Sequence, residues 1–173
     1  MQIRKGLKSD IDGLAALYDE LNDYLDRHIN YPGWRKGIYP VREDAVQGID
    51  EGSLFVADAD GKAAGTFILR QQPEKGYELA DWKNNLNYNE IFIIHTFAVH
   101  PQFFHLGIGK KMLAFILEYA ARMNKKAVRL DVYEKNIPAI RLYEKLGFQY
   151  IDTVDLGYSI YGLDRFRLYQ RLL

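Results

Sequence analysis

A glycine-rich turn at residues 100–112 is the segment with the clearest chemistry in this sequence. It reads His-Pro-Gln-Phe-Phe-His-Leu-Gly-Ile-Gly-Lys-Lys-Met and joins an apolar run to an amphipathic run. A strand that enters a helix through such a turn leaves backbone N–H groups, from about Leu106 to Lys110, directed at one place. The helix dipole adds positive potential there, and Gly107 and Gly109 let a ligand approach closely. The turn predicts a site for an anion such as a pyrophosphate; a helix start that happens to contain two glycines is the competing interpretation.

Spacing excludes the two best-known phosphate-binding loops. A Walker A loop would place glycine where Phe104 stands and Ser or Thr where Lys111 stands. A dinucleotide fingerprint would need a third glycine at the position of Met112. The turn therefore belongs to another class of anion-binding loop, or to none.

A second motif lies at residues 136–148 and reads Asn-Ile-Pro-Ala-Ile-Arg-Leu-Tyr-Glu-Lys-Leu-Gly-Phe. Asn136 suits a helix cap, and Pro138 suits the first turn that follows it. Together with Phe97-Ala-Val-His-Pro101 and the glycine turn, this segment resembles the GNAT superfamily of N-acetyltransferases. The resemblance covers residues 91–150, and the order of the flanking elements fits the rest of the chain.

The resemblance implies an α/β (α+β) fold with a mixed, mostly antiparallel sheet, flanked by helices, whose central strands 91–99 and 127–133 splay apart. It also implies a single N-acetyltransferase domain over residues 1–173 that uses acetyl-CoA as co-substrate and no metal. Relatives usually carry Gln or Arg at the position of Phe104, so the way this loop is braced stays open. The residues expected to contact acetyl-CoA are Phe97, Ala98, Val99, His105, Leu106, Gly107, Ile108, Gly109, Lys110 and Asn136.

The expected reaction is direct transfer of an acetyl group from a thioester to an amine. The sequence contains no cysteine, so an acyl-cysteine intermediate is not available and a ternary complex is favoured. The departing thiolate needs a proton, and the resemblance implies Tyr143 as the general acid. A structural alternative stays open, because Ile140, Tyr143 and Leu146 recur at helical spacing and could form a core stripe.

His95 is the candidate base for the amine proton, since imidazole exchanges protons near neutral pH. Strand alternation puts Ile93, His95 and Phe97 on one side of the sheet, and in relatives a histidine at this place belongs to the proton pathway. Histone-type relatives carry a catalytic glutamate where Ile93 stands, so that base is absent. Glu90, acting through a water chain, is a weaker candidate. A core histidine held by a hydrogen bond is the structural alternative for His95.

The variable segments 24–39 and 77–88 hold seven of the fifteen Tyr and Trp residues. Aromatic walls with acidic neighbours suit a small cationic amine through cation–π and carboxylate contacts. The same aromatic side chains could instead close a small N-terminal core. The expected acceptor residues are Tyr31, Trp34, Tyr39 and Trp82, with Asp23, Asp26 and Asp81 as acidic neighbours.

Three functions fit these residues. The first is acetylation of a small-molecule amine. The second is acetylation of a protein N-terminus or lysine, which needs an open groove in place of an aromatic pocket. The third is a non-catalytic acyl-CoA-binding regulatory domain, against which His95 and Tyr143 argue. We expect neither a nucleic-acid nor a membrane partner; relatives often form homodimers, and strand 166–172 is a candidate edge.

The elements that must position these residues follow from hydrophobic periodicity and from turn residues. Ser9 is a candidate cap for the first helix, and Asp60-Gly61 predicts a tight hairpin. The polar segment 72–89 predicts a binding loop or a mobile segment. The pattern predicts helices at 10–27, 42–49, 109–123 and 138–146, and strands at 54–58, 64–71, 91–99, 127–133, 148–154 and 166–172.

Charge is balanced in total, with 23 Lys+Arg and 23 Asp+Glu, but it is uneven along the chain. Residues 91–173 carry 12 basic and 7 acidic side chains, whereas residues 1–90 carry 11 and 16. We therefore expect positive potential over Gly107–Lys111 and negative potential over the aromatic segments. With 48% hydrophobic residues, no apolar run of membrane-spanning length and no signal core, the sequence predicts a folded, cytoplasmic protein.

Overall fold

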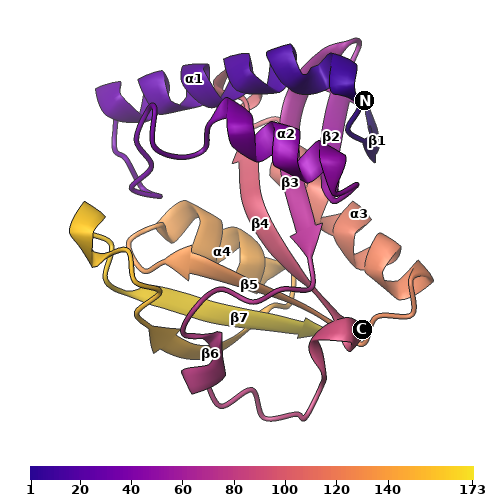
Figure 1. The fold of residues 1–173 in the computed structure, drawn as a ribbon, viewed down its shortest axis with the longest axis vertical. Coiled ribbons are helices and arrows are strands. Elements are labelled where there is room, and N and C mark those ends of the chain that lie inside the picture. Colours follow the sequence, from indigo (N-terminus) through magenta and orange to yellow (C-terminus); the bar gives the residue numbers. More distant parts are fainter. The chain divides into compact units, whose positions relative to one another are not determined.

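A computed structural model describes residues 1–173, and the chain forms two compact units. The first unit comprises Met1–Asn30, Trp34–Leu69 and His95–Phe115, and the second comprises Tyr31–Gly33, Arg70–Ile94 and Ile116–Leu173. Seven strands are hydrogen-bonded in the order β1-β2-β3-β4-β5-β7-β6, and four helices accompany them (Figure 1). The single domain over residues 1–173 stays a prediction.

The strands and helices fall where the sequence predicts, with one addition. The addition is a short first strand, whose residues Gln-Ile-Arg-Lys offer too little apolar alternation to be recognised. The strands are β1 Gln2–Lys5, β2 Leu54–Ala59, β3 Lys62–Arg70, β4 Ile91–Val99, β5 Ala127–Tyr133, β6 Gln149–Val154 and β7 Phe166–Leu172. The helices are α1 Ile11–Arg27, α2 Arg42–Asp50, α3 Ile108–Arg122 and α4 Ile137–Lys145.

The sheet is mixed and mostly antiparallel, which confirms the predicted fold class. The pairs β1/β2, β2/β3, β5/β7 and β6/β7 are antiparallel, and β4/β5 is parallel. The parallel ladder joins Ile91–Ile94 to Ala127–Leu130 and ends there, although both strands continue. A ladder that ends midway along both strands is what splayed central strands require.

The first unit is layered around β2 and β3. Leu54 and Val56 of β2 belong to a buried cluster with apolar side chains of α1 and α2, and in Figure 1 these two helices lie beside β2 and β3. Phe55, between them in sequence, stacks on Phe67 of β3 at 5.1 Å and meets Phe115 of α3 at 5.7 Å. Period-two alternation thus gives β2 two buried faces, with helices on both.

The second unit is built on the antiparallel ladders β5/β7 and β7/β6. Its core joins apolar residues of β4, β5, β6 and β7. Strand β7 lies between β5 and β6, so the expectation that 166–172 forms an edge is wrong, and β6 is the edge strand. The last strand of a chain need not be the last strand of its sheet, and sequence order alone does not reveal this inversion.

The segment between β3 and β4 is packed against the sheet of the second unit. Short 3-10 turns form at Tyr77–Leu79 and Tyr88–Glu90. The Tyr77 side chain is fully buried, and its hydroxyl donates to Asp131 of β5 at 2.8 Å. The polar composition of residues 72–89 therefore conceals a few anchoring aromatic side chains.

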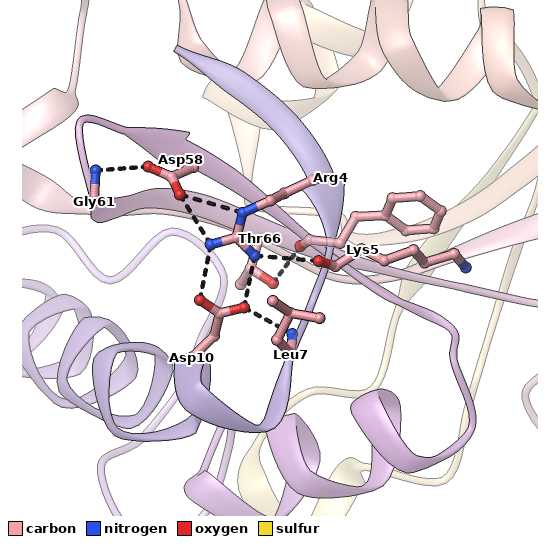
Figure 2. Close-up of polar contacts among 8 residues, drawn as sticks. Arg4, Lys5, Leu7, Asp10, Asp58, Gly61 and Thr66 are labelled. Carbon is pink, nitrogen blue, oxygen red and sulfur yellow. Dashed lines mark hydrogen bonds and ion pairs between the residues drawn. The ribbon is translucent and has the colours of Figure 1, made fainter.

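Arg4 of β1 ties three segments of the first unit together (Figure 2). Its guanidinium donates to both carboxylate oxygens of Asp10, at 2.7 and 2.9 Å, and to Asp58 Oδ2 of β2 at 2.8 Å. Asp10 also accepts the N–H of Leu7 at 2.7 Å, so Asp10, and not Ser9 as predicted, organises the approach to α1. The hydrogen bond from Arg4 is the main reason why the pKa of Asp10 is lowered. For Asp58 the N–H of Gly61 lowers the pKa most, and Arg4 adds to it.

We expect Arg4→Met to lower the free energy of unfolding at pH 7 by about 1–3 kcal/mol, because two part-buried carboxylates lose their donor. Folding depresses both carboxyl pKa values, so this stabilisation is present at neutral pH and is lost as the pH falls below about 4. Urea denaturation from pH 7 to pH 3 should therefore show a shallower acid loss in the variant. Arg42→Met is the matched control, because Arg42 and Asp12 form an exposed pair. An equally steep acid loss in wild type and Arg4→Met would contradict this account.

Candidate functional site

The residues predicted to bind the co-substrate are gathered mainly in the first unit. It contains the carboxyl half of β4 with His95, the whole turn into α3, and the aromatic residues Trp34 and Tyr39. The second unit holds Tyr31, Trp82, Asn136 and Tyr143.

The turn from β4 into α3 has the open backbone that the sequence predicts. His105 and Gly107 adopt left-handed conformations, with φ of +64° and +76°. A Cβ added at Gly107 would meet no atom within 4 Å, so this glycine borders open space. Helix α3 begins at Ile108, and the N–H of Lys111 donates to the Gly107 carbonyl at 3.1 Å. The N–H of Leu106 donates to the Phe103 carbonyl at 3.4 Å, whereas the N–H groups of Gly107–Lys110 have no acceptor within the helix, which makes them available to an anion.

The charges of the first turn of α3 strengthen this field. The turn contains no acidic side chain, whereas Lys110 and Lys111 are both present and exposed. Helices ordinarily place carboxylates at this end, because the positive pole of the dipole repels cations. Two lysines at the positive end are unfavourable for the isolated helix and favourable for a bound anion.

Phe104, the departure from the pattern of relatives, braces the turn by packing. Its ring meets Tyr24 of α1 edge-on at 5.2 Å and packs against the buried cluster beneath α1. The contact is apolar, so it fixes the loop without a side-chain hydrogen bond. Apolar packing therefore braces this loop.

His100 holds the start of the same turn. Its Nδ1 accepts the N–H of Gln102 at 3.2 Å, and its Nε2 lies 3.1 Å from Glu20 Oε2 of α1. Burial lowers the pKa of His100, and Glu20 partly opposes that shift. A neutral ring that accepts at Nδ1 carries its proton on Nε2 and donates it to Glu20.

Helix α3 packs against β3 through a glycine. A Cβ at Gly65 would lie 2.6 Å from Met112 Sδ and 2.9 Å from the Ala98 carbonyl oxygen. Only a residue without a side chain fits there. Gly65 therefore fixes the distance from β3 to the first turn of α3 and to the end of β4.

Strand β4 contains a feature that the sequence does not reveal. Thr96 is left-handed, with φ of +47°, although it lies in the middle of the strand. Its hydroxyl shares a 2.7 Å hydrogen bond with the Tyr39 hydroxyl. A left-handed residue breaks the alternation of side chains along a strand. The alternation from Ile93 to Phe97 therefore does not establish that His95 and Phe97 share a face of the sheet. No residue type marks a left-handed position in a strand, and a β-branched threonine argues against one.

In the second unit, Asn136 precedes α4 as its N-cap and Tyr143 lies within α4, as predicted. Asn136 Oδ1 accepts the N–H of Ala139 at 3.4 Å, which confirms the helix cap. Tyr143 is 5% exposed, and its ring lies 5.9 Å from that of Phe148. Burial, and secondarily the charge of Asp131, raises the pKa of Tyr143. The phenol thus keeps its proton at neutral pH, which is the state that a general acid needs.

Glu90 is a poor candidate base. Its carboxylate binds the ammonium of Lys126 and accepts the N–H of Asn87 at 2.9 Å. The ion pair with Lys126 is the main reason why the pKa of Glu90 is lowered. A carboxylate stabilised in this way takes up a proton less readily. His95 therefore stays the stronger prediction for the base.

The predicted acceptor residues differ in their surroundings. Trp34 is half-buried beside Tyr39, with ring centroids 5.4 Å apart, and Tyr31 is half-buried in the second unit. Trp82 donates its indole N–H to the Tyr77 carbonyl at 2.8 Å and stacks on Arg129 of β5, whose guanidinium carbon lies 3.9 Å from its ring centroid. This packing favours the structural alternative for Trp82.

The acidic neighbours are also partly engaged. Asp23 holds Lys36 with both carboxylate oxygens at 2.8 Å, which neutralises it, and Asp81 accepts the N–H of Lys83 at 3.3 Å. Asp26 is exposed. No group of three or more acidic, histidine or cysteine side chains is arranged to hold a metal ion. None of the helices has the length and apolar character that crossing a bilayer requires.

The chain matches a known protein family. The model for the acetyltransferase (GNAT) family covers residues 14–148 and so draws on both units. An uncharacterized N-acetyltransferase of Methanocaldococcus jannaschii is 29% identical over 79% of this chain, and the match spans 59% of that protein's length. A spermine/spermidine N(1)-acetyltransferase of Bacillus subtilis is 36% identical over 37% of this chain and 43% of its own length.

Solved structures share the fold. An acetyltransferase of the GNAT family from Streptococcus agalactiae aligns with a TM-score of 0.83 and 24% identity over 99% of this chain and 95% of its own. A Salmonella typhimurium protein described as a putative acetyltransferase with its cofactor acetyl-CoA aligns with a TM-score of 0.72 and 18% identity, covering 100% and 94%. At these identities the likeness shows the fold alone.

The charge at the start of α3 yields a stability test. We expect Lys110→Glu to raise the free energy of unfolding by about 0.5–1 kcal/mol, because a carboxylate suits the positive end of the helix dipole. Lys145→Glu, in the last turn of α4, should lower the free energy of unfolding by a similar amount for the opposite reason. Thermal denaturation at low ionic strength measures both. A loss of stability in Lys110→Glu would show that the lysine is already compensated within the chain.

Proposed function

Because the chain belongs to the GNAT family of acetyltransferases, we propose that it moves an acetyl group from acetyl-CoA directly to a primary amine of a small molecule. One observation carries the proposal. The turn into α3 presents backbone N–H groups, two lysines and no carboxylate beside an open glycine. This donor set fits a pyrophosphate, which is the anionic part of coenzyme A.

The same unit offers the contacts that acetyl-CoA needs. The N–H groups near Gly107–Lys110 would hold the pyrophosphate, with Lys110 as a counter-charge. The backbone of Phe97–Val99 would pair with the pantetheine arm as an added strand does. Acetyl-CoA supplies the activated thioester.

Two side chains are proposed to handle protons. His95 accepts the proton of the incoming amine, and Tyr143 gives a proton to the departing thiolate. The phenol of Tyr143 is protonated at neutral pH, which its part requires, although burial raises its pKa and makes it a weaker acid. The absence of cysteine from the chain supports direct attack by the amine over an acyl-cysteine intermediate.

The acceptor is proposed to be a small cationic or amphipathic amine. In the first unit, half-buried Trp34 provides aromatic surface, and the exposed carboxylate of Asp26 provides negative charge. The Bacillus subtilis relative, named for spermine and spermidine, points to the same class of substrate. Acetylation of a peptide N-terminus or lysine is the second candidate.

An acceptor panel tests the proposal and separates the alternatives. Release of free CoA thiol is measured with spermidine, simple monoamines, a peptide with a free N-terminus and a lysine peptide. We expect turnover with a small amine. Turnover with peptides alone would favour protein acetylation. Binding of CoA without turnover of any amine would favour a regulatory acyl-CoA-binding domain.

Gly107→Ala should weaken acetyl-CoA binding at least about tenfold, equivalent to about 1.4 kcal/mol, because the new methyl group enters the open space beside the turn. Gly52→Ala is the matched control. Gly52 is also left-handed, with φ of +64° against +76°, and also borders open space, so both variants carry the same backbone strain. Isothermal titration calorimetry should therefore separate them. Equal affinities would place the pyrophosphate elsewhere.

Tyr143→Phe should lower kcat about 100-fold and leave the KM for acetyl-CoA within about twofold, as expected when a general acid is removed. Tyr169→Phe is the control, since Tyr169 is a buried tyrosine that donates to Glu144 of α4 at 2.8 Å. Steady-state kinetics with saturating amine gives both constants. An unchanged kcat in Tyr143→Phe would show that this tyrosine serves only in core packing.

A further inference from the structure

Thr96 is the only residue inside a strand whose φ is positive without being glycine. The branched side chain of threonine crowds the backbone in this conformation, which is rare for such residues. Residues persist there only when their surroundings hold them, and they concentrate at functional sites. Thr96 is also 6% exposed, so the strain lies in the interior of the first unit.

The contact that holds Thr96 comes from the segment between α1 and α2. Tyr39 Oη and Thr96 Oγ1 are 2.7 Å apart. Tyr39 is itself fixed from two sides: its carbonyl accepts the side-chain amide of Asn22 at 3.3 Å, and Trp34 meets its ring edge-on at 5.4 Å. Asn22 belongs to α1 and is 2% exposed. The hydroxyl that reaches β4 is therefore attached to rigid structure.

The conformation of Thr96 decides where the next peptide groups point. The N–H of Phe97 follows the ψ rotation of Thr96, so a change of this residue to the extended region would turn that N–H away from its present direction. Beyond it, Phe97 packs toward Phe67 at 6.5 Å, and Ala98 lies in the cluster beneath α1. Packing therefore fixes the side chains on both faces of the strand end, and the left-handed residue Thr96 directly precedes them.

We propose that Tyr39 is a positioning residue that acts through Thr96. Its hydrogen bond holds β4 in the left-handed conformation that directs the N–H groups of Phe97–Val99 toward the acetyl thioester. This inference rests on the proposed function and gives Tyr39 a different part from acceptor binding. Removing the bond lets Thr96 relax, and the donors that stabilise the developing oxyanion lose their alignment.

The first test does not need activity. In a left-handed residue the amide proton and Hα of the same residue lie close together, so Thr96 should give a strong intraresidue cross-peak in the nuclear Overhauser spectrum. We expect that cross-peak in the wild type and its weakening in Tyr39→Phe and in Thr96→Val, which remove the same bond from its two ends. An unchanged cross-peak in both variants would overturn the proposal, whether or not the protein proves to be an acetyltransferase.

The second test is kinetic and includes a rescue. Tyr39→Phe should lower kcat about tenfold while the KM for acetyl-CoA stays within about twofold, since the missing contact acts on alignment. Glycine adopts a positive φ without strain, so Tyr39→Phe combined with Thr96→Gly should recover kcat to within about threefold of wild type. A direct contact between Tyr39 and the acceptor would instead raise the KM for the amine, and glycine at 96 would not repair it; that result overturns the proposal.

Tyr150→Phe is the matched control. Tyr150 and Thr153 form another tyrosine–threonine hydroxyl pair, 2.9 Å apart and exposed on β6. Its loss should leave kcat and the Thr96 cross-peak unchanged. Circular dichroism confirms that each variant is folded before it is compared.

Discussion

The start of α3 imposes the constraint on which the first unit depends. The positive end of this helix holds two lysines and no carboxylate. Its first backbone N–H groups have no acceptor within the helix. Such a cluster is unfavourable until an anion arrives, so the surrounding structure must hold it. Phe104 on Tyr24, His100 on Glu20 and Gly65 against Met112 supply that support from α1 and β3. Among these supports His100 and Met112 are buried, whereas Gly107 borders open space.

Thr96 of β4, the strand before α3, is another unfavourable feature that its surroundings support. Its left-handed backbone costs stability, and the bond to Tyr39 compensates locally. The second unit contains a comparable case in Arg129, which is 2% exposed, stacks on Trp82 and donates to Gln170 at 2.9 Å. Burial lowers the pKa of Arg129, so its environment disfavours the charge. The strained backbone of Thr96 and the buried charge of Arg129 are tolerated because neighbouring contacts hold each residue in place.

Local signals in the sequence predicted most of the fold. Periodicity located all four helices and six of the seven strands, and Asp60-Gly61 located the β2–β3 hairpin. Strand β1 was missed, because its four residues offer little apolar alternation and its pairing with β2, including the ion pair of Arg4 with Asp58, joins residues distant in sequence. The position of β7 between β5 and β6 was missed for a similar reason, since strand order is a property of the whole sheet.

In the candidate site too, local features could be predicted from the sequence and long-range contacts could not. The turn into α3 and the Asn136 cap are local motifs, so residue types and spacing were enough to predict their backbone, whereas anion binding by the turn stays a proposal. The Tyr39–Thr96 bond joins residues 57 positions apart, and the stacking of Trp82 on Arg129 joins two segments of the second unit. Neither contact leaves a pattern in a single sequence. Contacts of this kind require the fold before they can be seen.

The central claim is that the α3 turn binds the pyrophosphate of coenzyme A. A titration of ¹⁵N-labelled protein with CoA, followed by amide chemical shifts, tests it most directly. The account predicts that the amide protons of Gly107–Lys110 shift downfield as they donate to phosphate oxygens, and that adenosine alone does not produce these shifts. Saturable CoA binding that leaves those four amides unmoved would contradict it.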